Sequence, residues 1–219
     1  KDDARNSTTG RNANDNFYGV ALTTRRITEV ESLAAAVEAI TDAPKLFGTG
    51  SGDANIVNAL ATADSPVTGS VAARMDGLNY ARTFVAYSGD DAGLTGTAHT
   101  EWSGFAETED VDDPFVEAAI LGKMFPTDPG SSTFNLQELA GIIADDLTTT
   151  QRTNALAKNA NIYATVTSTA DGFQSGTVAE GEWIDIIWGL DWGAKEKKAK
   201  TIGVLSLTAI SRSLALLRS

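Results

Sequence analysis

The feature that most constrains the fold is an alternation of strand-length apolar runs with segments of helical period in the first part of the chain. The expected strands are the short apolar runs at residues 17–22, 45–47 and 82–87. Between them, apolar residues recur at helical spacing over 27–40 and again over 71–78. This strand–helix–strand order favours parallel strand pairing through right-handed crossovers.

The second part of the chain adds two helices, a hairpin and a last helix. Pro114 opens one expected helix, and a second follows Thr148 and Gln151, which have the spacing of a capping box. The run at 161–166 predicts a strand, with a turn at Asp171–Gly172 and a returning strand from Phe173. The sequence therefore predicts an α/β fold: a central mixed, mostly parallel sheet flanked by helices, with an antiparallel hairpin near one edge.

We expect one α/β domain with two short flanking segments. Residues 1–16 are polar and without periodicity, which predicts a flexible arm or a loop cut from something longer. Residues 17–193 form the expected core domain. Residues 194–219 are the expected basic C-terminal segment, which is apolar enough in its second part to pack as a helix.

Composition excludes several classes of chemistry. The 219 residues include no Cys, so disulfides, thiolate metal sites and cysteine nucleophiles are excluded. His99 is the one histidine, which leaves little room for imidazole relays. No apolar run approaches the roughly 20 residues that span a bilayer, so we expect no membrane insertion.

Charge is negative overall and unevenly distributed. The net charge of −12 disfavours direct nucleic-acid binding, because phosphate backbones repel such a surface. Residues 194–219 carry six basic residues and one acidic residue, a balance of 6 − 1 = +5, which leaves −12 − 5 = −17 for residues 1–193. Copies of the chain could meet head to tail through this asymmetry. The alternative is that the lysines form the solvated face of a helix.

A glycine-rich run offers one candidate ligand site. Gly48–Gly52 follows an expected strand and precedes an expected helix, which is where phosphate-binding loops lie. The run lacks the third glycine of a dinucleotide fingerprint and the Gly-Lys-Ser/Thr of a P-loop. A tight turn is the simpler interpretation, and a small nucleotide- or phosphate-binding α/β enzyme is the alternative function.

Acidic residues and the histidine offer weaker candidates. The acids at 107–113 could suggest a hard cation, but the ligand spacing of a calcium loop is absent, and Pro114 places them near a helix N-terminus that favours negative charge. His99 lies in a Gly- and Thr-rich stretch with no G-x-S-x-G in the chain, so an exposed loop histidine is preferred over a catalytic triad. We therefore predict no catalytic residue, metal or cofactor.

The tryptophans point to packing. Trp183, Trp188 and Trp192 are close in sequence, and Trp102 stands apart. Rings of this kind can stack on sugars or bases. Their spacing distributes them around one helix, which favours a core or a subunit interface over a ligand platform.

Several segments, taken in order, resemble a known family. In the first part of the chain they are residues 17–19, 45–47 and 80–85. In the second part they are residues 119–134, 139–141, 146–148, 158–159, Asn161, Tyr163, 181–185 and 191–192. Their order and spacing are similar to the sheath-like proteins of contractile phage tails, in particular the family long filed as an uncharacterised phage protein. The resemblance runs from Phe17 to Trp192, or 192 − 17 + 1 = 176 of 219 residues. Residues 201–219 do not resemble the family's C-terminal portion, and the family's usual segment ahead of Phe17 is missing.

The resemblance implies a structural subunit rather than an enzyme. It implies a six-fold or helical sheath of self-associating copies around an inner tail tube, in contact with baseplate proteins. The implied location is the virion, with assembly in the host cytoplasm, and a tail or capsid adaptor would share that location. The residues expected at the subunit interface are Trp183, Asp185, Trp188, Asp191, Trp192, Lys195, Lys197 and Lys198.

Overall fold

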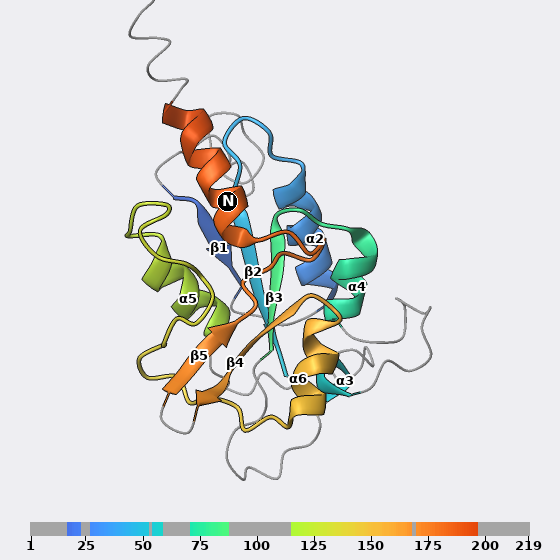
Figure 1. Cartoon of the computed structure of the whole chain (residues 1–219). Helices are drawn as coiled ribbons and strands as arrows, with labels where there is room; N and C mark the ends of the chain where they lie inside the picture. The colour runs from blue at the N-terminus through green and yellow to red at the C-terminus, as the bar shows by residue number, and fades with distance from the viewer. Residues whose placement is uncertain are drawn as a thin grey trace, which may run out of the picture.

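A five-stranded sheet forms the centre of the molecule (Figure 1). The computed structural model describes residues 17–22, 27–52, 54–58, 71–87, 115–167 and 170–196. The strands are β1 (Gly19–Ala21), β2 (Leu46–Ser51), β3 (Thr83–Tyr87), β4 (Ala160–Thr167) and β5 (Ala170–Gln174). They lie side by side in chain order, and β1 to β4 pair in parallel while β5 pairs antiparallel with β4. The expected α/β fold with a mostly parallel sheet and an antiparallel hairpin at one edge is confirmed.

Helices connect and cover the strands. They are α2 (Ile27–Glu38), α3 (Ala54–Val57), α4 (Val71–Leu78), α5 (Val116–Met124), α6 (Thr149–Leu156) and a helix over 184–196. The capping box expected before α6 is present: the Thr148 side chain accepts from the Gln151 backbone N–H, and the Gln151 side chain accepts from the Thr148 backbone N–H. This arrangement satisfies two N–H groups that the first turn of a helix leaves unpaired.

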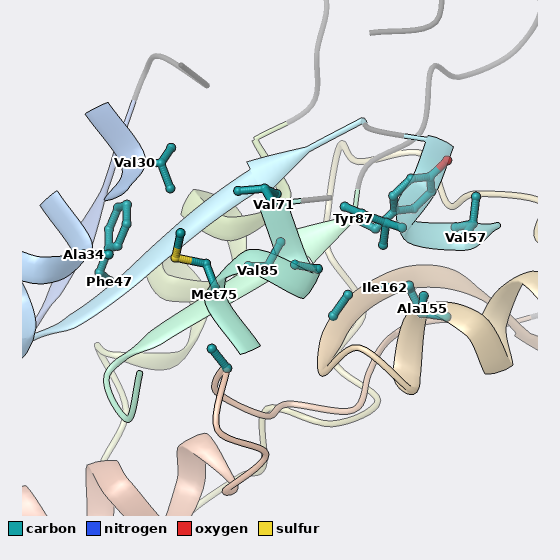
Figure 2. Packing of buried hydrophobic residues seen from close by; sticks show 14 of the residues in the cluster. Val30, Ala34, Phe47, Val57, Val71, Met75, Val85, Tyr87, Ala155 and Ile162 are labelled. Atoms are coloured by element: carbon teal, nitrogen blue, oxygen red, sulfur yellow. The ribbon is translucent and has the colours of Figure 1, made fainter. Parts of the chain in front are cut away.

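One face of the sheet is covered by α2, α3, α4 and α6. Alternate residues of the strands point to this face, among them Phe47, Val85 and Ile162, and they belong to one buried cluster with Val30 and Met75 of the helices (Figure 2). Because sequential parallel strands joined by right-handed crossovers place their helices on one side, this layer follows from the strand order.

The opposite face is covered by α5 and the 184–196 helix. The intervening strand residues Phe84 and Tyr163 point here and pack with Ile120, Ile184 and Trp188. Beyond β5 the sheet is extended by a bridge, because the Phe173 N–H donates to the Gln137 carbonyl at 2.9 Å. The sheet is therefore buried between two helical layers.

The expected hairpin turn is wrong in its position. Asp171 and Gly172 lie inside β5, paired with Thr165 and Ala164 of β4. The residues that join the two strands are 168–169, which lie outside the described residues. A register shift between Thr165 and Thr167 moves the pairing here, and sequence periodicity carries no signal for such a bulge.

One of the expected segment boundaries, that between residues 193 and 194, falls inside a described helix. The 184–196 helix runs through residues 193 and 194, where the core domain was expected to end. Residues 1–16 lie outside the described residues. Among the helices of the described ranges, none combines the length and apolar character needed to cross a membrane.

Candidate functional site

Three residues from distant parts of the chain form a charged cluster at one end of the sheet. Arg82, just before β3, forms a bidentate ion pair with Asp191 of the 184–196 helix. The Arg82 Nη2 atom lies 2.9 Å from Asp191 Oδ1, and Arg82 Nη1 contacts Asp191 Oδ2. The Tyr18 hydroxyl, just before β1, donates to the same Oδ2 at 2.6 Å. We call Tyr18, Arg82 and Asp191 the clasp, because it joins two strand starts to the last described helix.

Two members of the clasp, the Tyr18 phenol and the Arg82 guanidinium, are kept protonated by their surroundings. Burial, reinforced by the hydrogen bond to Asp191, raises the pKa of Tyr18 far above its ordinary value, so the phenol stays protonated. The hydrogen bond to Asp191 also raises the pKa of Arg82, against the opposing effect of burial. A carboxylate already bound by a guanidinium and a phenol is poorly placed to take a proton from a substrate. The clasp is therefore suited to fixing the position of the helix.

A cleft of about 360 Å³ lies beside the clasp. Besides the clasp residues it is lined by the Phe17 ring, Lys45, Trp188 and Trp192. The Lys45 ammonium lies 4.6 Å from the centre of the Phe17 ring. This cation–π contact engages the lysine with another residue that lines the cleft. The half-exposed Trp192 ring gives the cleft an apolar rim.

Among the residues of the resemblance, Asn161 has the most complete set of partners. Its buried amide donates to the carbonyls of Val85 at 3.1 Å and Thr177 at 2.8 Å. Its Oδ1 accepts from the N–H groups of Gly176 at 2.7 Å and Thr177 at 2.9 Å. One side chain thus binds four backbone groups, and it ties β3 and β4 to the segment after β5.

Other residues of the resemblance serve in the same way. Buried Lys158 donates to three carbonyls at the end of α3, including those of Ile56 and Asn58 at 2.9 Å. The Tyr163 hydroxyl accepts from the Leu139 N–H at 3.0 Å, and Asp185 accepts from the backbone N–H of Phe134 at 3.2 Å. Burial raises the pKa of Asp185, which the Phe134 N–H partly offsets. These side chains are engaged in holding loops to the sheet.

The structure separates the expected interface residues into two groups. Trp188 is buried, and the side chains of Asp185 and Asp191 have partners within the chain. Trp183, Trp192 and Lys195 are exposed. Lys197 and Lys198 lie outside the described residues.

The glycine-rich run is a strand, which corrects the expectation of a turn. Residues 48–51 belong to β2, are buried, and pair with β3, while Gly48 also pairs with β1. A Cβ at Gly48 would stand 2.5 Å from the Phe84 ring, so glycine here allows the ring to cross the strand. The loop expected to cradle a phosphate is reduced to the residues after Ser51. The alternative function of nucleotide binding stays a prediction.

The remaining candidates fall outside the part of the chain that the structure describes. These are His99, Trp102 and the acidic run at 107–113. Within the described ranges, no group of three His, Asp or Glu side chains is placed to hold a metal ion.

Sequence reasoning missed the clasp as a unit. Tyr18, Arg82 and Asp191 each stand in a segment of the resemblance, but Arg82 and Asp191 are 109 residues apart and no local pattern pairs them. Comparison with known proteins adds no further assignment: no protein-family model matches the chain, and no curated protein matches it.

Proposed function

We propose that the chain is a structural subunit of a contractile viral tail sheath. In this proposal it assembles with copies of itself around an inner tail tube and contracts to drive the tube through the host envelope. The proposal starts from the resemblance over residues 17–192, and a virion location follows from it.

The observation that supports the proposal best is the role of the residues that carry the resemblance. Asn161, Lys158 and Asp185 bind backbone groups of this chain, and Asp191 is paired with Arg82. In an enzyme, the distinctive residues include titratable groups that face a cleft and are available to a ligand. Asp191 does face the cleft, but its carboxylate is bound by Arg82 and Tyr18. In this chain, the residues that carry the resemblance hold loops and helices against the sheet. A subunit that transmits force as a rigid body requires such contacts.

A second line of support is the distribution of charge. The acidic body of −17 and the basic segment of +5 favour contacts in which one copy's basic end meets the next copy's body. Contraction would then be a change of interface between rigid subunits, with energy stored in the extended lattice and without nucleotide.

Quantitative mass spectrometry of purified tail particles tests the proposal. A sheath subunit is expected at a copy number that grows with tail length, comparable with that of the tube subunit and far above that of baseplate proteins. The chain's absence from the particles, or a fixed small copy number, would contradict the proposal.

A further inference from the structure

The 184–196 helix, which stands at one end of the sheet (Figure 1), has one apolar face that the described residues of the chain leave exposed. Trp183, Ile186 and Leu190 are 45%, 49% and 68% exposed. Ile186 and Leu190 lie four residues apart on the helix. Trp183, which directly precedes the helix and bridges to Thr177, continues this spacing at the N-terminal end, while Ile184 and Trp188 face the core. Gly193 continues the stripe, and a Cβ built on it would meet nothing within 4 Å. We call Trp183, Ile186, Leu190 and Gly193 the open stripe.

The sequence beyond the described helix carries a stripe of the same spacing. Its members are Leu207, Ile210, Leu214 and Leu217, at intervals of three, four and three residues. Read from the other end, these intervals match those of the open stripe. The antiparallel pairing is Trp183 with Leu217, Ile186 with Leu214, Leu190 with Ile210, and Gly193 with Leu207. Matched intervals of three and four are the pattern of two helices that pack along a seam.

We propose that residues 207–217 dock antiparallel on the open stripe of the same chain. Such docking buries the half-exposed indole of Trp183 and the side chains of Ile186 and Leu190, which otherwise face water. The smallest residue of the stripe, Gly193, leaves room for the two backbones to approach at the turn end. The inference concerns the fold of this chain and stands without the proposed function.

Chain length favours the same chain over a second copy as the occupant. If the returning segment extends as far past Leu207 as the helix extends past Gly193, about seven residues remain for the connection, which is within the usual length for helix pairs. A segment joined by so short a connection has an effective concentration in the millimolar range, which a separate copy does not reach in dilute solution.

Charge favours the antiparallel direction. Residues 197–219 contain five basic residues and no acidic residue. At the far end of the open stripe, the exposed acid Glu182 directly precedes Trp183 and accepts from its backbone N–H at 3.3 Å. Pairing Leu217 with Trp183 brings Arg218 to this acidic end, whereas a parallel arrangement would not.

Disulfide trapping in the full-length chain tests the proposal, because the natural sequence contains no Cys. The test variant is Ile186→Cys with Leu214→Cys. The matched control is Ile186→Cys with Arg212→Cys, since residue 212 lies on the opposite side of a helix that presents Leu214 to the stripe. A disulfide needs the two Cα atoms about 4.4–6.8 Å apart, which only the first pair should reach.

The expected result is a disulfide within one chain that forms at least ten times faster in the test pair than in the control. It is read from faster migration on non-reducing gels and from a monomer mass on size exclusion. A second pair, Leu190→Cys with Ile210→Cys, should behave like the first, and circular dichroism of the reduced variants checks that they fold.

Three outcomes would overturn the proposal. Folded variants of both test pairs that stay reduced would show that the segment does not dock. Equal rates in test and control pairs would show contact without a fixed register. A disulfide between two chains, with a dimer mass, would show that a second copy covers the open stripe.

Discussion

Arg82 and Asp191 are 109 residues apart in sequence and form a bidentate ion pair between the start of β3 and the 184–196 helix. The side chains are largely shielded from water, at 23% and 15% exposed. The same carboxylate accepts from the Tyr18 hydroxyl, so one acidic side chain fixes the last described helix to two strands. This relationship makes the position of the helix depend on a few named contacts.

Removing the carboxylate should therefore destabilise the fold. Asp191→Ala leaves Arg82 shielded without its partner and frees the Tyr18 hydroxyl, and we expect the free energy of unfolding to fall by about 2–3 kcal/mol. Urea denaturation followed by tryptophan fluorescence measures it. Asp146→Ala, at an exposed position, is the control and should change the value by less than about 0.5 kcal/mol. Equal effects in the two variants would show that the clasp contributes nothing specific.

Two asparagines with different numbers of partners give a second prediction. Asn161 satisfies four backbone groups, whereas Asn154 donates to one, the Val57 carbonyl at 3.0 Å. We expect Asn161→Ala to cost at least about 3 kcal/mol of unfolding free energy and Asn154→Ala about 1 kcal/mol. Thermal unfolding of both variants checks the order, and a reversed order would show that the Asn161 network is not what secures this part of the sheet.

Two glycines test the strand assignment of the glycine-rich run. Gly48→Ala places a Cβ against the Phe84 ring and should destabilise the chain by about 1–3 kcal/mol. Gly122→Ala lies in α5, where a Cβ meets nothing within 4 Å, and should stabilise it by about 0.5–1 kcal/mol. Chemical denaturation distinguishes the two signs. A harmless Gly48→Ala would fit an open loop rather than a central strand.

Glu38 gives a dependence on pH. Its Oε1 accepts from the Arg82 N–H at 2.6 Å, and burial raises its pKa above the ordinary value of 4.5 despite that hydrogen bond. The last turn of α2 also disfavours a carboxylate. Because the folded state holds this proton more tightly than the unfolded chain, wild-type stability from this group is greatest in acid and is lost as pH rises through the folded pKa.

Glu38→Gln keeps an acceptor for the Arg82 N–H and removes the titration. The stability of this variant relative to wild type should therefore increase from pH 4 to pH 7. Parallel urea titrations across this range measure the difference. A constant difference would show that the carboxyl titrates alike in the folded and unfolded chains.

The parallel pairing of the first strands and most helix positions could be predicted from the sequence, because they follow from apolar periodicity and local caps. The capping box at Thr148 and Gln151 is such a local signal. The sequence wrongly predicts a turn at the glycine-rich run, which forms part of β2, because Gly and Ser are common in loops. Its burial between β1 and β3 is a tertiary effect that overrides local preference.

The candidate site was predictable only in part. Asp185 and Asp191 were singled out by the resemblance, but their partners, the Phe134 N–H and Arg82, depend on how distant segments meet. The four bonds of Asn161 were likewise invisible, because they require the chain after β5 to return beside β4. Contacts of this kind follow from the tertiary fold and leave no pattern in adjacent residues.

Immunogold electron microscopy tests the central claim most directly. Antibody raised against the purified chain is applied to particles from the culture that produces it, with extended and contracted tails compared on the same grids. The account predicts gold along the full length of contractile tails in both states. Gold confined to one end of the tail, or unlabelled tails with the antigen in the soluble lysate, would contradict it.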